Sequence, residues 1–416
     1  MSIVSIEKCA LFMQGNIRLQ HRLIWGLSLA SVVVYINLYV VQGMLPLIAT
    51  HFNVMPAHAT LLLSVTSFSM AFSLLFYAVM SDKIGRRKPL LWSLGLLVLV
   101  DLILVGLQGF SSLIAMRLLQ GVLLAAVPAI AMAYFKDMLD KTILLSAGAV
   151  YIAANSLGGI AGRLIGGAMA AYLDWPMAMM ILTFISAVGV LMVYFLLPNR
   201  DRVRAEREPK IRLSFDDLRG FTTHLSDSTL RKLYLLGAIA FMVMVNQFSY
   251  IQLHLMQAPF NWGRFEVTLI FLCYLSGTYA SFRSAKWVTR VGRQPLFVLS
   301  TSVMLLGSLV TTIDTSSTII AGFLLSSFGF FTFHSVCNAW VAQRAQQHRA
   351  KATALYLCSY YLGAALGGPF LLPFWHQWGW NGVVVGSLLL LLVVMGVVAL
   401  LARDNRSRQT NALLTE

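Results

Sequence analysis

Two charged side chains inside long hydrophobic runs are the first candidates for chemistry in this sequence. Asp101 is the only carboxylate near the middle of such a run, and Arg117 opens another run in the stretch RLLQG. An arginine inside hydrocarbon costs at least about 2.5 kcal/mol unless it is paired or hydrated. Both residues are therefore candidates for a functional site.

The spacing of the two residues suggests that they meet. A turn centred near Gly109 separates their runs, and it lies the same number of positions from Asp101 as from Arg117. In an antiparallel helical hairpin they should lie at similar depth, where an ion pair lowers the cost of both charges. We hypothesise that Asp101 pairs with Arg117 and helps to switch the charge of Arg117 during proton transfer. A static structural pair and a peripheral place for Asp101 are the alternatives.

A third buried charge is expected at Arg163, within the stretch NSLGGIAGRLIGG. The glycines Gly158, Gly162 and Gly166 share one helix face, and small residues at this spacing let helices pack closely. The possible roles of Arg163 are binding of an anionic substrate, pairing with a backbone or carboxylate group, and that of a buried structural cation. His334 lies on an aromatic stripe of a later run, where it is either a second proton carrier or a packing residue.

The elements that must position these residues are membrane-spanning helices. Of the 416 residues, 58% are hydrophobic and 11% are charged, a composition that no soluble domain of this length requires. The runs are continuous, about 20 residues long and able to cross a bilayer as helices, which excludes alternating barrel strands. The predicted fold class is an all-α membrane protein with twelve transmembrane helices. The expected spans are 24–46, 59–80, 90–108, 111–135, 145–172, 176–198, 231–256, 266–287, 295–313, 317–342, 352–375 and 380–402.

The net charge of +15 would by itself suit a nucleic-acid partner. The Lys and Arg residues fall almost entirely in the loops on one side of the expected membrane, and the opposite loops contain only Arg264. By the positive-inside rule, this asymmetry predicts that both termini and the middle loop are cytoplasmic. The positive charge therefore sets the orientation of the chain in the membrane. The expected partner is the lipid bilayer of the cell inner membrane, not a nucleic acid.

The chain divides into two related halves. A polar stretch separates six spans from six, which predicts a first bundle at 1–198, a cytoplasmic linker at 199–230 and a second bundle at 231–416. At an offset of 205, Gly158 matches Gly363 and Gly162 matches Gly367. A second match, at an offset of 207, relates the loop after the second span to the loop after the eighth. Two six-helix pseudo-repeats are therefore expected, with a substrate site between them.

Other sources of chemistry are missing from the sequence. There is no Walker A motif and no H-E-x-x-H or similar metal spacing. The four cysteines, Cys9, Cys273, Cys337 and Cys358, have no spacing that suggests a metal or disulfide framework. We expect no enzyme activity, cofactor or metal, so transport would be driven by an ion gradient or by the substrate's own gradient.

The loop AVMSDKIGRRKPLL resembles the signature loop of the major facilitator superfamily, with Ala78 in place of its first glycine. In that family the acid and the arginines latch a cytoplasmic gate, a role that the resemblance assigns here to Asp82 and Arg86. The alternative is that these cations only fix the topology. The expected gate residues in the two matching loops are Asp82, Gly85, Arg86, Arg87, Arg290, Gly292 and Arg293.

Two further motifs narrow the resemblance. RLLQG resembles the R-x-x-Q-G motif of proton-coupled antiporters, whose arginine is implicated in proton coupling. NSLGGIAGRLIGG resembles the exporter motif G-x-x-x-G-P-x-x-G-G, except that Arg163 stands where the motif has proline. Together with ALYLCSYYLG, these stretches resemble the twelve-span drug/proton antiporter branch, and within it the bacterial YnfM-type efflux transporters.

The resemblance implies a monomeric, proton-driven exporter of a small organic or drug-like molecule that works by alternating access. In this superfamily the first, fourth, seventh and tenth spans line the central cavity. An uptake symporter or facilitator for a sugar or organic anion is one rival function, favoured by Arg163 and Arg117. A receptor or sensor that does not transport is another. The expected cavity residues are Asn37, Gln42, Tyr151, Asn155, Arg163, Asn246, Gln247, His254, His334, Asn338, Tyr356 and Tyr360.

Overall fold

The computed structural model describes residues 3–198, 216–345, 347 and 349–413. Two sets of helices follow one another along the chain, separated by the short helix α10 (Asp216–Ser226). The first set is α1 (Ile3–Gly43), α2 (Leu45–His51), α3 (Pro56–Ala59), α4 (Leu61–Ile84), α5 (Arg87–Val105), α6 (Phe110–Leu124), α7 (Ala126–Met138), α8 (Lys141–Tyr172) and α9 (Trp175–Leu196). The second set is α11 (Ser228–Leu255), the 3₁₀ helix η2 (Glu266–Cys273), α12 (Tyr274–Val291), α13 (Arg293–Val310), α14 (Ser316–Arg344) and α15 (Arg349–Leu413).

These helices account for the twelve expected spans. Within the described residues, ten helices are long and apolar enough to cross a membrane. One of them, Ala350–Asp404, contains two spans, because its backbone leaves the helical region at Trp378 and Gly379. The chain η2–α12 occupies the place of the expected span 266–287. The prediction of an all-α, twelve-helix membrane protein is therefore confirmed.

Two spans are less regular than the hydropathy predicted. The expected span 111–135 is divided into α6 and α7 at Ala125. Pro128 lies in the first turn of α7, where its missing N–H does not remove a bond from the new helix. The expected span 266–287 begins with the eight residues of η2 in the tighter 3₁₀ form before α12 continues it.

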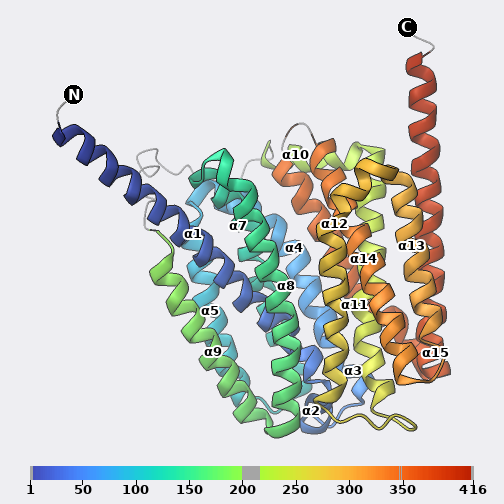
Figure 1. The fold of residues 1–416 in the computed structure, drawn as a ribbon. Coiled ribbons are helices and arrows are strands. Elements are labelled where there is room, and N and C mark those ends of the chain that lie inside the picture. Colours follow the sequence, from blue (N-terminus) through green and yellow to red (C-terminus); the bar gives the residue numbers. More distant parts are fainter. Residues whose placement is uncertain (1–2, 199–215, 346, 348, 414–416) are drawn as a thin grey trace.

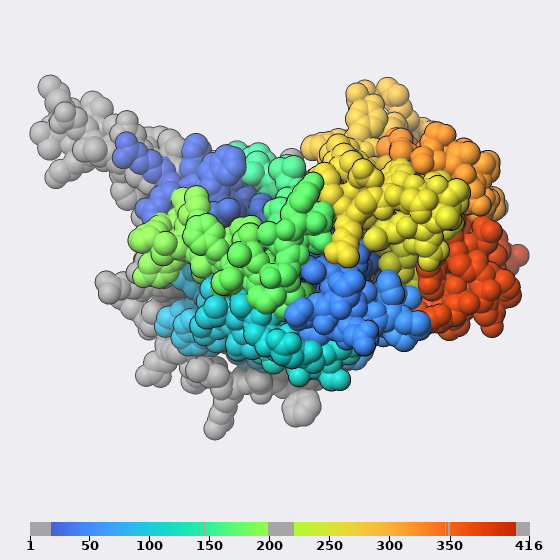
Figure 2. Space-filling model, turned by 90° about the horizontal axis from the view of Figure 1, so that it is seen from below, coloured from blue at the N-terminus to red at the C-terminus, as the bar shows by residue number. Residues whose placement is uncertain are grey.

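Different elements lie at the two ends of the helix bundle (Figure 1). The start of α1, the end of α15 and the helix α10 lie at one end, here called the termini side. The short helices α2 and α3 lie at the other end, here called the α2–α3 side. Seen from the α2–α3 side, the elements of the two halves pack against each other (Figure 2). The described part of the expected linker 199–230 contains α10 and the start of α11; the stretch 199–215 lies outside the described residues.

The outer surface of the bundle is apolar. Trp92, Phe184 and Phe282 are 66%, 69% and 75% exposed, respectively. A soluble monomer rarely shows such side chains over a large contiguous area, because their contact with water is unfavourable. Within a bilayer they face lipid tails, as expected for a multi-pass membrane protein.

The glycine faces bring helices into backbone contact in both halves. A Cβ atom on Gly158 would lie 2.9 Å from Val32 Cα, and one on Gly162 would lie 2.8 Å from Ile36 Cα, so α8 lies directly against α1. In the second half, a Cβ atom on Gly363 would lie 2.6 Å from the carbonyl carbon of Ala238 in α11. Gly367 of α15 packs against Asn246, which also belongs to α11.

The matching loops also share a backbone conformation. Gly85, which ends α4, has φ 90° and ψ 166°, and Gly292, which ends α12, has φ 84° and ψ 168°. Residues with a side chain rarely adopt this region, so glycine is required at both turns. Because these glycines lie 207 positions apart, the shared conformation supports the duplication inferred from the sequence.

Candidate functional site

A chain of buried hydrogen bonds lies inside the first half and includes Asp101. Gln120 Nε2 donates to Asp101 Oδ1 at 2.7 Å, and Ser186 Oγ donates to Asp101 Oδ2 at 2.7 Å. Asn37 Nδ2 in turn donates to Ser186 Oγ at 2.9 Å. All four side chains are 1% exposed or less. The carboxylate is thus removed from solvent, with both oxygens accepting hydrogen bonds from neutral donors.

Arg117 extends this chain to α1. Its Nη1 donates to Gln120 Oε1 at 2.7 Å and to the carbonyl of Asn37 at 3.1 Å, while Nη2 donates to the carbonyl of Leu38 at 3.1 Å. The guanidinium therefore ties α6 to the backbone of α1. Its Nε has no hydrogen-bond partner among the described residues, and such an unsatisfied buried donor is costly.

The structure refines the expected pairing of Asp101 with Arg117. The two residues are brought together in one network, as the hairpin argument anticipated, but they form no direct ion pair within the described part of the chain. Gln120 stands between them and bonds to both. Gln120 follows Arg117 by about one turn of α6, and tertiary packing places its amide between the two charges.

Sequence reasoning missed Ser186 as a member of this site. It lies in α9 (Trp175–Leu196), and it is fully buried. A hydroxyl inside such an apolar helix was the available signal. That signal is weak, because serine can satisfy itself by bonding to a carbonyl of its own helix.

Arg163 lies where the two halves meet on the α2–α3 side. Its Nε donates to Gln42 Oε1 at 2.8 Å and its Nη1 to the carbonyl of Gly159 at 2.8 Å. Gln42 Nε2 then donates to Ser249 Oγ at 2.7 Å and to the carbonyl of Val245 at 3.1 Å, both in α11. One arginine of the first half is thus connected through one glutamine to the second half.

Aromatic rings surround the Arg163 guanidinium. Its central carbon lies 3.7 Å from the ring centre of Tyr39, 4.8 Å from that of Phe271 and 4.9 Å from that of Tyr274. Tyr39 belongs to α1, whereas Phe271 and Tyr274 belong to η2 and α12. We call the contact made by Arg163, Gln42, Tyr39, Phe271 and Tyr274 the seam.

A second aromatic group belongs mainly to the other half and contains His334. Tyr356 Oη and His334 Nδ1 are 2.9 Å apart, and Tyr360 lies against the His334 ring with centroids 4.8 Å apart. Tyr360 also stacks on Phe241 with ring centroids 3.6 Å apart. Of the expected cavity residues, His334, Tyr356 and Tyr360 are therefore brought together.

Several other expected cavity residues bond within a single half. Asn246 donates to the carbonyls of Met242 and Ala364, at 2.9 and 3.3 Å, and Gln247 donates to Ser308 Oγ at 3.0 Å. These amides join helices inside the second half. His254 lies apart from them, 3.3 Å from an oxygen of Asp314, with its ring stacked on Trp380.

The remaining cavity candidates lie in α8 and in α14. Asn155 accepts a hydrogen bond from Ser31 of α1, and Tyr151 is buried with a hydroxyl that lacks a partner among the described residues. Asn338, in α14, likewise has a buried and unsatisfied amide oxygen. Tyr35, which the sequence argument did not select, meets Tyr361 of the second half through hydroxyls 3.0 Å apart.

The expected gate loop of the first half ties helix ends together on the termini side. Arg86 forms an ion pair with Asp82 and another with Asp137 of α7, with Nε 3.0 Å from Asp137 Oδ2. Its Nη1 also donates to Ser81 Oγ at 2.7 Å. Arg87 reaches the end of α9, with its guanidinium 5.4 Å from the ring centre of Tyr194. In this conformation, these contacts link α4, α5, α7 and α9 of one half.

The matching loop of the second half is held differently. Arg293 donates to Gln343 Oε1 and lies 5.3 Å from the ring centre of Trp340. Nearby, Arg344 forms an ion pair with Asp227, with Nε 2.9 Å from Oδ2. Arg290 precedes Gly292 at the end of α12. These arginine contacts on the termini side thus lie within each half, whereas those of the seam cross between halves.

Asp227 both caps α11 and pairs with Arg344. Its Oδ1 accepts from the amides of Thr229 and Leu230, at 2.8 and 3.3 Å. Partial burial alone would raise the pKa of Asp227, but the bond from Arg344, the two amides and the arginine charge together hold that pKa below its ordinary value of 3.8. A lowered pKa in the folded state means that the ionised carboxylate stabilises the fold.

This arrangement predicts a pH effect on stability. The Asp227 contribution is complete above the unfolded-state pKa and disappears as the pH falls through the folded-state value. Asp227→Asn keeps the cap but loses the ion pair, so it should cost only about 0.5 kcal/mol at neutral pH. Asp227→Ala also loses the cap and should cost about 1.5 kcal/mol. Thermal unfolding in detergent between pH 7 and pH 3 checks this, and an Asp227→Asn variant that retains the full acid dependence would contradict it.

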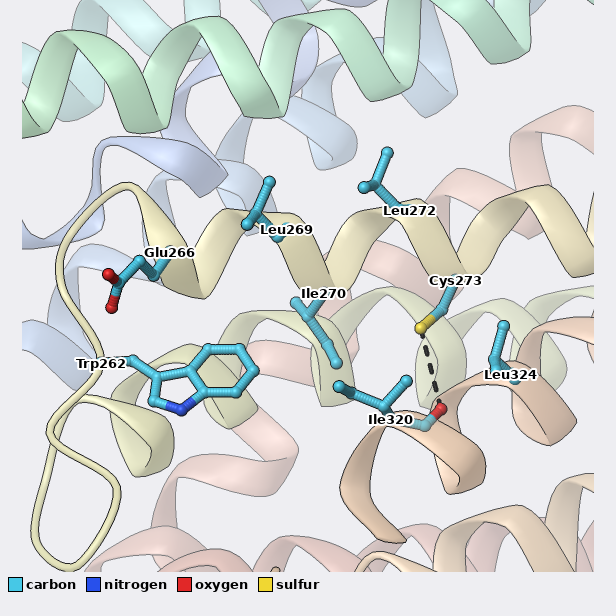
Figure 3. Close-up of a pocket in the computed structure, with 8 residues that line it drawn as sticks. All are labelled: Trp262, Glu266, Leu269, Ile270, Leu272, Cys273, Ile320 and Leu324. Atoms are coloured by element: carbon cyan, nitrogen blue, oxygen red, sulfur yellow. Dashed lines mark hydrogen bonds between the residues drawn. The ribbon is translucent and has the colours of Figure 1, made fainter. Parts of the chain in front are cut away.

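A cavity of about 480 Å³ lies outside these networks, beside η2 and α14 (Figure 3). It is lined mainly by apolar side chains, including Ile270, Leu272 and Ile320, and by Trp262. The carboxylate at its edge, Glu266, accepts a hydrogen bond from the amide of Gly263 at 2.8 Å. None of the residues selected from the sequence lines this cavity. Within the described part of the chain, no group of three or more His, Cys, Asp or Glu residues could hold a metal ion.

Comparison with known proteins agrees with this architecture. The family model described as "Major Facilitator Superfamily" matches residues 27–271 and 233–415. The inner membrane transport protein YnfM of Escherichia coli is 33% identical over 392 residues, which cover 94% of this chain and 92% of YnfM. The uncharacterized MFS-type transporter YybF of Bacillus subtilis is also 33% identical, covering 88% of this chain and 90% of that protein.

Solved structures share the fold at lower identity. The human organic anion transporter MFSD10 superposes with a TM-score of 0.67 at 19% identity, covering 92% of this chain and 99% of that one. A POT family transporter in complex with 5-aminolevulinic acid gives a TM-score of 0.73 at 14% identity, covering 91% and 95%. With a family model that matches both halves and relatives that are similar along nearly their whole length, the chain belongs to the major facilitator superfamily, as a multi-pass membrane transporter and not an enzyme.

Proposed function

We propose that this transporter is a proton-driven antiporter of the inner membrane that exports a small organic molecule by alternating access. The observation that carries the proposal is the Asp101 network. A titratable carboxylate, 0% exposed, is linked through one neutral side chain to a buried arginine, and intramembrane ionisable residues in such positions mark proton relays.

The amide of Gln120 offers a way for proton binding to move a helix. With Asp101 ionised, the Gln120 NH₂ group faces Asp101 and its oxygen accepts from Arg117. A proton on Asp101 needs an acceptor, which Gln120 provides if its amide turns over. Its NH₂ group then faces the guanidinium, two donors oppose each other, and the bond between Gln120 and Arg117 is lost.

Loss of that bond would reach α1 through Arg117. The guanidinium holds the carbonyls of Asn37 and Leu38, and the same helix carries Gln42 at the seam. A change in the protonation of Asp101 would therefore be transmitted through α1 to the contact between the halves on the α2–α3 side. Alternating access requires this type of coupling between a proton site and a gate.

The conformation supports a gate on each side. On the α2–α3 side, the halves are joined by the seam and by Arg264, which donates to the carbonyl of Ala170 at 3.2 Å. On the termini side, Arg86 and Arg344 bond within their own halves. We propose that the termini side is cytoplasmic and that Arg86 and its neighbours form the inner gate when the halves close there.

An uptake symporter or facilitator for an organic anion is the second candidate. The observation in its favour is Arg163, which is buried at the seam and forms no ion pair with a carboxylate among the described residues. The two candidates differ in the direction of proton and substrate movement, which a reconstituted system measures directly.

The test has two steps. A toxicity and metabolite export screen compares a deletion strain with strains that overproduce the native chain or Arg117→Ala, and it should identify a compound exported only by the native chain. The purified protein in proteoliposomes should then move that compound against an imposed proton flux, and reversing the pH gradient should reverse accumulation. Accumulation in the same direction as the protons would overturn the antiporter proposal.

A further inference from the structure

The candidate site has two parts, and a buried positive charge has a buried negative charge nearby in only one of them. Asp101 and Arg117, both buried, share one network through Gln120. Arg163 is 3% exposed, and the described residues provide it with amide, carbonyl and aromatic partners but no carboxylate. The seam therefore contains a positive charge that no described side chain neutralises.

An arginine stays charged in a protein, because its guanidinium is not deprotonated there. Aromatic faces and amide oxygens stabilise the cation but do not cancel its charge. A buried cation without a counter-ion attracts an anion, and the planar guanidinium fits a carboxylate through two parallel hydrogen bonds. Since Nε and Nη1 are held by the neutral groups of Gln42 and Gly159, a carboxylate would be a stronger partner than either.

The rings around Arg163 indicate the shape of such an anion. Tyr39, Phe271 and Tyr274 surround the guanidinium. The aromatic surface continues through Tyr39 to Tyr35, with ring centroids 6.1 Å apart, and then to Tyr361, which meets Tyr35 through the hydroxyls. Stacked and edge contacts with such rings favour a flat apolar body.

We propose that Arg163 binds the carboxylate of an organic-anion substrate with a flat, aromatic body, and that the aromatic residues of the seam contact that body. This inference rests on the proposed transport function and names its substrate class. When the anion binds, it replaces Gln42 on the guanidinium. Gln42 is then no longer held by Arg163 next to Ser249 and Val245, so substrate binding loosens the seam that must open for release.

Binding without any gradient tests this inference separately from proton coupling. The full-length protein in nanodiscs is titrated with 1-naphthoate, with the neutral 1-naphthamide and with the cationic 1-naphthylmethylamine, and tryptophan fluorescence or isothermal calorimetry reports binding. We expect the native chain to bind 1-naphthoate at least about tenfold more tightly than the other two probes, since one charge-assisted contact commonly has this effect.

Arg163→Gln should reduce 1-naphthoate binding at least about tenfold and leave 1-naphthamide binding unchanged, because only the charged contact is lost. Arg163→Lys should retain part of the preference, since it keeps the charge but not the paired hydrogen bonds. Arg231→Gln is the control, because it removes an exposed arginine of α11 that donates to the carbonyl of Leu225, outside the seam and both gates, and it should not alter the preference. Thermal unfolding without ligand shows whether each variant is folded.

The inference is overturned if the native chain does not prefer the anion, or if folded Arg163→Gln binds it as tightly as the native chain. The proton-antiport proposal has a different test, which is the reversal of transport with the pH gradient. Anion binding that depends on Arg163 without proton-driven transport would leave this inference standing and remove the antiporter. Proton-driven export by a chain that shows no preference for the anion would overturn this inference and leave the antiporter proposal standing.

Discussion

Asp101→Asn is expected to abolish proton-driven accumulation of substrate while leaving the transporter folded. The amide has nearly the same shape as the carboxylate but cannot exchange a proton, so Gln120 would lose the signal that turns its own amide. Coupling between two sites usually corresponds to about 5–150-fold, and we expect a loss of accumulation of at least about tenfold. Substrate uptake driven by a pH gradient in proteoliposomes measures the effect.

The controls for this prediction separate coupling from folding. Ser186→Ala removes one hydrogen bond to Asp101 but keeps the titratable group, so transport should be slower yet still driven by protons. Counterflow exchange, which needs no proton gradient, should survive in both variants. An Asp101→Asn protein that still accumulates substrate against its gradient would show that Asp101 is not the coupling residue.

Gly162→Val is expected to be the most damaging change to the fold. The added side chain would meet the Cα and the carbonyl oxygen of Ile36, both 2.8 Å from the position of its Cβ. Backbone atoms cannot move aside by a change of rotamer, so α8 must separate from α1. Overpacking typically costs about 1–3 kcal/mol and occasionally more, and we expect a cost of at least about 2 kcal/mol.

The matched control is Gly95→Val in α5. No atom lies within 4 Å of a Cβ added at Gly95, so the same substitution meets open space there. The melting temperature in detergent should fall strongly for Gly162→Val and little for Gly95→Val. Equal melting temperatures would contradict the close approach of the two helices. Because Arg163 adjoins Gly162, the separation should also weaken its bond to Gln42.

The two halves repeat their scaffold and differ in their chemistry. Gly85 and Gly292 have the same backbone conformation, and glycine faces join α8 to α1 and α15 to α11. At the offset of 207, the position of Asp101 is taken by Ser308, a neutral residue bonded to Gln247. We propose that the first half handles the proton and that the second half supplies much of the substrate wall.

The residues of the site show where sequence reasoning reached its limit. The hairpin argument brought Asp101 and Arg117 to one depth, but it could not place Gln120 between them. The cavity list included Asn246 and Gln247, whose amides bond inside the second half, and it omitted Tyr39, Phe271 and Ser186. A polar residue in a hydrophobic span can face a cavity or a neighbouring helix, and both satisfy its hydrogen bonds equally well.

The sequence by itself determined the twelve spans, their pairing into two repeats and the glycines at the helix contacts and turns. These features depend on local quantities, namely the transfer energy of a run of residues, the spacing of small residues along one helix and the conformations open to glycine. The tertiary structure alone decided which side chains share a hydrogen bond and that the partners of Arg163 come from both halves. Such contacts depend on how each helix is rotated and which helix lies opposite, and packing of the whole bundle sets both.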